Sequence, residues 1–300
     1  MFNFIKLGKI GLVEAVISVV AVTTLWFAWG LNLGIDFTGG SLLEIDFSAS
    51  SADRPDAQTI KTKLEDLGIG NSLIQPLGEK GMMLRFNSVD EETHQKILNG
   101  LTEIAKDNQL VERRFESIGP TIGAELSRNA FYTIALVLIA ICLYIAWAFR
   151  KISKPVASWK YSLAALLALF HDVLIVVGLF IVLGKFMNAA VDTAFVAAVL
   201  TVLGYSVNDT VVIFDRIREN LAKRSGTLTE IVNFSINETL VRSLNTGFSA
   251  ILALLAIFFF GGESIRYFAL ALIVGIVTGT YSSIFIASPL LLIWEKMKRR

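Results

Sequence analysis

Six long apolar segments restrict what this chain can fold into. Each is close to or above the roughly 20 residues that cross the hydrocarbon core of a bilayer as a helix. Inside lipid, a lone segment satisfies its backbone hydrogen bonds only as a helix. With 54% hydrophobic and 18% charged residues, the 300-residue chain is too apolar for a soluble protein. We predict an α-helical membrane protein with six transmembrane helices, at residues 10–29, 130–149, 161–183, 193–214, 244–260 and 267–294.

Lysine and arginine residues predict the orientation of these helices. They gather before the first segment, after the second, after the fourth and after the sixth, and the other short connections are nearly neutral. Basic loops face the cytoplasm, so both termini are expected there, in a multi-pass protein of the bacterial inner membrane. The net charge of +1 gives no basic surface for nucleic acid. The basic residues are Lys6, Lys9, Arg150, Lys151, Lys154, Lys160, Arg216, Arg218, Lys223, Arg224, Lys296, Lys298, Arg299 and Arg300.

The segment at 10–29 resembles the apolar part of a signal peptide, because Lys6 and Lys9 precede it. Its length fits a full span, and Trp26 and Trp29 stand at its far end, where interface anchors occur. We therefore expect an uncleaved first helix.

Three regions follow: residues 1–30 with the first helix, an extracytoplasmic α+β domain at 31–128, and a five-helix membrane domain at 129–300 with a cytoplasmic loop at 215–241. Alternating and helical periodicities within 31–128 predict the order βαββαβ, which is that of a ferredoxin-like sandwich. Ser88 and Glu91 match a capping box before its second helix. The strands are expected at 41–47, 72–75, 82–86 and 110–117, and the helices at 57–67 and 92–106.

The loop at 215–241 has its own pattern. Residues 215–223 continue the fourth span into water, and Thr227 with Glu230 matches a capping box before a helix at 231–240. Two arrangements remain open for this loop: in the first its apolar residues lie on the membrane surface, and in the second the loop is a solvated helical hairpin.

Ionisable residues inside the spans are the strongest functional signal, because each costs about 2.5–3.5 kcal/mol to insert and is usually functional. Asp209 lies in the fourth span, and Thr201, Tyr205 and Asn208 share its helix face. Arg242 opens the fifth span. Its face also carries Glu238, Asn245, Thr246 and Ser249.

Asp209 and Arg242 lie in consecutive antiparallel helices at compatible depths. Burial favours the neutral form of a carboxyl group and a nearby arginine favours the charged form, so an arginine that approaches and leaves predicts a proton switch. Two structural alternatives stay open. Asp209 and Arg242 form a static buried pair, or Arg242 pairs with Glu238 one turn earlier.

Three further features are weaker. His171 and Asp172 are adjacent in the third span but point about 100° apart. Asp172 is expected to support the polar network of the fourth span, and a direct role in carrying protons is the alternative. Glu14 is interpreted as reaching the cytoplasmic interface. Gly275 and Gly279 form a Gly-x-x-x-Gly pattern that predicts close helix packing, within the chain or against a partner.

Known catalytic and cofactor motifs are absent from the sequence. It contains no nucleophile–base motif, P-loop, dinucleotide fingerprint or metal-ligand spacing. We therefore expect no enzyme activity, no cofactor and no metal, with an ion gradient as the energy source.

Several motifs together resemble the SecF family of protein-export membrane proteins. They span most of the chain: GIDFTGG at 34–40, SIGP at 117–120, GYSVNDTVVIFDRIREN at 204–220, GGESIR at 261–266 and GTYSSIFIASP at 279–289. The resemblance implies that Asp209 is the proton-coupling residue and Arg242 its partner. It also implies that Gly34, Asp36, Gly39 and Gly40 couple the membrane helices to the outer domain.

The resemblance further implies a SecF-like subunit of the resistance-nodulation-division type that pairs with SecD. The pair would work with the SecYEG channel, and often with YajC, using the proton-motive force to assist preprotein export. Because this sequence has only six spans, SecD must be a separate chain. The alternatives are a small-molecule or lipid exporter of the same superfamily, disfavoured by the small outer domain, and a structural scaffold.

Overall fold

The computed structural model describes residues 2–47, 55–78, 80–105, 110–150 and 157–298. It divides the chain into two compact units, a helical unit (Met1–Asn32 with Tyr132–Arg300) and an α/β unit (Leu33–Phe131). Five residues covered by the predictions above lie outside the described residues: Lys106, Lys151, Lys154, Arg299 and Arg300.

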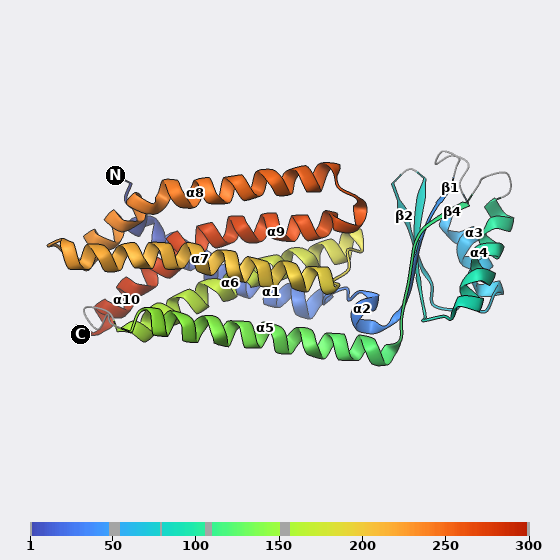
Figure 1. The fold of residues 1–300 in the computed structure, drawn as a ribbon, viewed down its shortest axis with the longest axis horizontal. Coiled ribbons are helices and arrows are strands. Elements are labelled where there is room, and N and C mark those ends of the chain that lie inside the picture. The colour runs from blue at the N-terminus through green and yellow to red at the C-terminus, as the bar shows by residue number, and fades with distance from the viewer. Residues whose placement is uncertain (1, 48–54, 79, 106–109, 151–156, 299–300) are drawn as a thin grey trace. The chain divides into compact units, whose positions relative to one another are not determined.

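The described residues include six helices that are long and apolar enough to cross a membrane, which confirms the predicted fold class (Figure 1). The sixth is divided by a five-residue π-helix, which the sequence did not predict. The spans are α1 (Phe4–Trp29), α5 (Pro120–Ala148), α6 (Ser158–Met187), α7 (Thr193–Lys223), α8 (Leu228–Phe260) and the series α9 (Glu263–Ser282), η1 (Ser283–Ala287) and α10 (Ser288–Lys298).

The predicted break between a helix at 231–240 and a span at 244 is wrong, because α8 is one continuous helix. Only Val241, Arg242 and Ser243 lie between the two predicted helices, and none of them stops a helix as proline would. The capping box of Thr227 and Glu230 at its start is confirmed.

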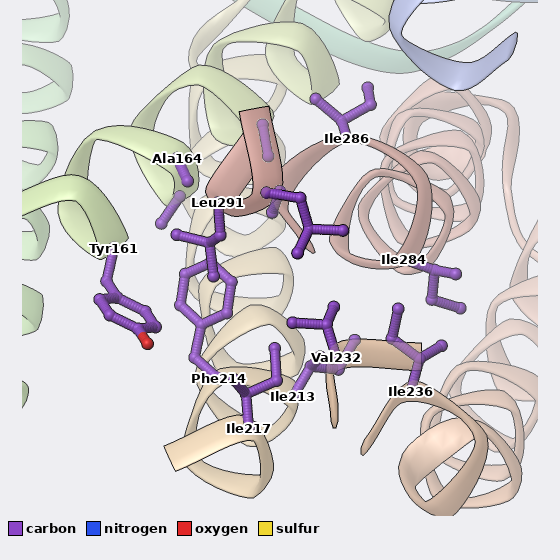
Figure 2. Close-up of a cluster of buried hydrophobic side chains, with 14 of the residues drawn as sticks. Tyr161, Ala164, Ile213, Phe214, Ile217, Val232, Ile236, Ile284, Ile286 and Leu291 are labelled. Carbon is purple, nitrogen blue, oxygen red and sulfur yellow. The ribbon is translucent and has the colours of Figure 1, made fainter. Parts of the chain in front are cut away.

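A hydrophobic cluster joins the first turns of α8 to α6, α7 and η1 (Figure 2). Phe214 of α7 packs edge-on against Tyr161 of α6, with ring centroids 5.2 Å apart. Val232 and Ile236 of α8 are fully buried in the same cluster. Of the two arrangements left open for residues 215–241, the structure has a helical hairpin, with apolar residues packed on α7 instead of on a membrane surface.

The glycine pattern of the last span packs within the chain. A Cβ on Gly275 would lie 2.1 Å from Val202 Cγ2, and one on Gly279 would lie 2.8 Å from Ser206 Cβ. These glycines therefore let α9 approach α7 at backbone distance, which brings the serines that follow Gly279 against α7.

The α/β unit has the predicted βαββαβ order, preceded by the short helix α2 (Ile35–Thr38). Its antiparallel sheet has the order β2-β3-β1-β4, which is the ferredoxin-like topology. Leu43, Ile45 and Phe47 alternate along β1 into the core that α3 and α4 cover. The elements are β1 (Gly40–Phe47), α3 (Ala57–Asp66), β2 (Leu73–Leu77), β3 (Gly81–Phe86), α4 (Glu91–Ala105) and β4 (Leu110–Ile118).

The predicted capping box of Ser88 and Glu91 is wrong. Asp90 caps α4 instead, since its Oδ1 accepts a hydrogen bond from the Thr93 amide at 2.9 Å. Aspartate caps a helix as well as serine does, and Asp90 directly precedes the first helical residue. Ser88 bonds the hydroxyl of Ser117 on β4.

We predict that Gly275→Ala destabilises the helical unit by about 1–3 kcal/mol, because the added methyl group overlaps Val202 in a packed helix interface. Gly204→Ala is the matched control, since a Cβ there meets nothing within 4 Å. The check is thermal unfolding of the two variants in detergent. Equal melting temperatures would show that the α7–α9 contact is looser than described.

Candidate functional site

Asp209 occupies the interior of the helical unit, on α7 where it meets α8 and η1. Its residue surface is 7% exposed, and its Oδ2 atom is buried with no hydrogen-bond partner among the described residues. The hydroxyl groups of Ser243 on α8 and Ser283 on η1 face this carboxyl group. An ionised carboxylate with so few partners is costly at this depth, so this position favours exchange of a proton.

Three other buried polar atoms around Asp209 also have unused hydrogen-bonding capacity. They are the hydroxyl oxygens of Tyr205, Ser243 and Thr280, and none of them completes a hydrogen bond in the described chain. Tyr205 and Thr280 face each other, and Ser243 faces Asp209. Gly247 makes room for them, because a Cβ there would lie 3.1 Å from the Tyr205 hydroxyl and 3.3 Å from that of Thr280. Buried polar groups are normally paired, so this cluster marks a functional position.

Arg242 lies on α8 close enough for its charge to act on Asp209, but the two form no ion pair. The structure therefore shows neither a buried ion pair between Asp209 and Arg242 nor an ion pair between Arg242 and Glu238. Glu238 Oε2 accepts a hydrogen bond from Asn220 Nδ2 at 2.8 Å and forms an ion pair with Arg216 Nε at 3.6 Å. Within the described residues no ion pair within 4.0 Å reaches the Arg242 guanidinium, which is exposed at the surface of this chain.

The other predicted polar residues do not gather around Asp209. Thr201 and Asn208 on α7, and Asn245 and Thr246 on α8, are all exposed at the surface of the helical unit. The hydroxyl groups of Thr201 and Thr246 donate to carbonyl oxygens four residues earlier in their own helices. Only Tyr205, half-buried, shares the interior with Asp209.

Asp172 on α6 is the centre of a second polar cluster and is fully buried. Its Oδ2 atom accepts hydrogen bonds from Ser206 on α7 at 2.6 Å and from Ser282 on α9 at 2.8 Å. The predicted link from Asp172 to the fourth span therefore exists, through Ser206, which sequence reasoning missed. A neighbouring bond of 2.8 Å between Thr210 and Ser283 connects this cluster to the surroundings of Asp209.

His171 and Glu14 extend this cluster to α1. His171 Nδ1 lies 3.2 Å from Asp172 Oδ1, and its Nε2 lies 3.4 Å from Glu14 Oε2. The interpretation of Glu14 as a residue that reaches the interface is therefore corrected. Glu14 is half-exposed but turned toward His171, because α1 packs along α6. No sequence signal joins these residues, which lie 157 positions apart.

The glycine-rich motif at 34–40 is tightly enclosed within the α/β unit. Gly39 has a φ of +73°, and a Cβ there would lie 2.8 Å from Pro120 Cα. Gly40 has a φ of +131°, and a Cβ there would lie 2.8 Å from the Phe86 carbonyl oxygen. Gly34 caps the short helix α2, which contains Asp36. The motif thus connects β1 rigidly to the start of α5.

Comparison with known proteins relates this geometry to a family. The model described as "Protein export membrane protein SecD/SecF, C-terminal" matches residues 98–297, and the "SecD/SecF GG Motif" model matches residues 25–50. The protein translocase subunit SecF of Thermobaculum terrenum is 41% identical over 294 residues, 94% of this chain and 90% of that protein. The SecF of Pseudomonas aeruginosa is 36% identical over 97% of this chain and 90% of its own length.

Solved structures give the same result. The crystal structure of SecDF, a translocon-associated membrane protein from Thermus thermophilus, matches all of this chain with a TM-score of 0.84 and 33% identity. The super-membrane-facing form of SecDF matches 99% of this chain with a TM-score of 0.70 and 32% identity. This chain spans 39% of each solved SecDF chain.

We predict that Gly39→Ala loosens the motif, because a side chain at this φ is strained and its Cβ overlaps Pro120. The expected cost is about 2 kcal/mol or more. Hydrogen–deuterium exchange should then be faster in β1 and in the first turns of α5. Gly119→Ala is the control, since a Cβ there meets nothing within 4 Å. Unchanged protection in Gly39→Ala would contradict the close contact.

Proposed function

The chain belongs to the SecD/SecF family of protein-export membrane proteins, and on that basis we propose that it uses the proton-motive force to assist preprotein export. The observation that carries this proposal is the position of Asp209. Within the part of the chain that the structure describes, one oxygen of this buried carboxyl group has no hydrogen-bond partner, and the nearby Arg242 forms no ion pair with it. Such a group changes charge at a high electrostatic cost, which is what a proton-driven motion requires.

The proposed cycle has two states. When Asp209 is protonated, its neutral carboxyl group tolerates the apolar surroundings and Arg242 stays turned away. When the proton leaves, the carboxylate attracts Arg242 and the hydroxyl groups of Tyr205 and Ser243. Because α8 is one unbroken helix from Leu228 to Phe260, a shift at Arg242 is transmitted along its whole length. Energy enters only as a proton, so the proposal needs no cofactor and no enzymatic step.

The exposed polar residues of α7 and α8 support SecD as a partner. Thr201, Asn208, Asn245 and Thr246 lie within membrane spans yet face outward from this chain. Polar groups at this depth face protein or water rather than lipid. In the SecDF structures the matching region is part of a longer chain, so we propose that a separate SecD covers this face.

We propose the bacterial inner membrane as the location, with both termini in the cytoplasm and the α/β unit outside, because the basic residues favour that orientation. The SecYEG channel, YajC and the emerging preprotein are the further partners that we propose. A small-molecule exporter is the second candidate. The family and its named relatives favour protein export instead.

We predict that Asp209→Asn abolishes the part of preprotein export that depends on the proton gradient, because the amide cannot release a proton. The measurement is export into inverted inner-membrane vesicles, with the gradient intact or collapsed by an ionophore. Asp215→Asn is the matched control, because this aspartate lies on the same helix but is exposed and paired with Arg218. Gradient-dependent export by Asp209→Asn at the level of the control would refute the proposal, provided that SecD still co-purifies.

We also predict that a cysteine at Asn245 crosslinks to SecD, after the single native Cys142 is replaced by serine. A cysteine at Leu136, on an exposed apolar part of α5, is the control and is expected to face lipid. Immunoblotting of the crosslinked product checks the result. Equal crosslinking at both positions would show that the polar face does not define the SecD interface.

A further inference from the structure

The buried string of Glu14, His171 and Asp172 crosses the helical unit without contacting Asp209 or Arg242. Asp172 is fully buried at the junction of α6, α7 and α9, and His171 is 2% exposed beside it. Glu14 lies at the other end, with a side chain that is 40% exposed. The string therefore runs from the surface of α1 to the centre of the unit.

The link between Glu14 and His171 is incomplete. Glu14 Oε2 and His171 Nε2 are buried, complete no hydrogen bond in the described chain and face each other at 3.4 Å. The hydroxyl group of Tyr281 on α9 also faces the carboxyl group of Glu14. The other Glu14 oxygen, Oε1, accepts a bond from Ser18 at 2.6 Å. A purely structural network is expected to satisfy all its members. One proton shared between these two atoms would satisfy both.

The far end of the string is fully bonded. Asp172 Oδ1 faces His171 Nδ1, while its Oδ2 accepts bonds from Ser206 and Ser282. Ser282 is the last residue of α9, and the π-helix η1 begins at the next residue. Single-turn π-helices inside α-helices occur frequently at functional sites. A change in the charge of Asp172 would therefore act directly on the irregular part of the last span.

We propose that Glu14, His171 and Asp172 form a second proton-exchange site, in which the imidazole ring of His171 passes a proton between the two carboxyl groups. The O–H bond of Glu14 breaks as the Nε2–H bond of His171 forms. The Nδ1–H bond breaks as the O–H bond of Asp172 forms, and the ring is left as its other tautomer. A return transfer or a ring flip restores it, and nothing is oxidised or reduced.

The groups around the ring are consistent with this role. Glu14 faces it from α1, Asp172 from α6 itself and Tyr281 from α9, with a ring centroid 6.5 Å away. Near the Asp172 end, α7 contributes the hydroxyl groups of Ser206 and Thr210, and η1 contributes that of Ser283. The biological role of this site depends on the proposed proton-driven function, but proton exchange at the site can be measured separately.

The chain has only two histidines, His94 and His171, so selective nitrogen-15 labelling of histidine gives ring signals from two side chains, each with two nitrogen atoms. The full chain, labelled in this way, is assembled with unlabelled SecD in lipid nanodiscs. Exchange of the ring protons with water is then measured by NMR between about pH 5 and 8, where an imidazole ordinarily titrates. His94, in the α/β unit, is the internal reference for an intact fold.

We expect the His171 ring protons to exchange with water in the wild type, and about a hundredfold more slowly in Glu14→Gln, which loses the acid–base group at the surface end. Asp215→Asn is the control and should leave this exchange unchanged, because Asp215 is exposed and paired with Arg218. Equal exchange in wild type and Glu14→Gln, or no exchange in the wild type, would overturn the site. If Asp209→Asn keeps full export while Glu14→Gln slows exchange, the site stands and the proposed drive through Asp209 fails.

Discussion

The structure depends on the cost of placing ionisable groups in the buried interior of a helix bundle. Asp172 and Asp209 lie on the neighbouring helices α6 and α7, and each meets this cost differently. Among the described residues, Asp172 is held by three polar neighbours, whereas Asp209 has an oxygen with no hydrogen-bond partner. A satisfied carboxylate can remain charged, and an unsatisfied one is stable mainly when neutral. Each is proposed to exchange a proton in its own way, Asp209 as Arg242 approaches and leaves, and Asp172 through the ring of His171.

Small residues create the geometry in which these groups act. Gly275 and Gly279 bring α9 against α7, and Gly247 leaves space for the hydroxyl groups of Tyr205 and Thr280. Because α9 is so close, Ser282 reaches Asp172 and Ser283 reaches Thr210. The helices thus contact one another through hydrogen-bonded polar groups as well as through apolar side chains. A change of charge on one helix therefore acts directly on the groups that the next helix contributes.

The sequence predicted the fold class and the burial of Asp209, because hydrophobic length and the cost of a buried charge are local signals; the role of Asp209 stays a prediction. Alternation along β1 and the βαββαβ order likewise identified the ferredoxin-like unit. It did not predict which polar residues of α7 face inward, since protein and lipid are equally apolar neighbours for a helix. Thr201 and Asn208 therefore turned out to be exposed, and Ser206 was missed. The pairing of Glu14 with His171 and the π-helix η1 depend on contacts between distant segments, which periodicity cannot show.

In the proposed cycle Asp209 gains and loses a proton within the membrane. Infrared difference spectroscopy of the SecD-bound chain in lipid can observe this event, because a protonated carboxyl group has its own carbonyl stretching band. We expect a band that appears and disappears as pH is changed and that is missing in Asp209→Asn. A spectrum without any band assignable to Asp209 across the pH range that supports export, or with a band that never changes, would contradict it.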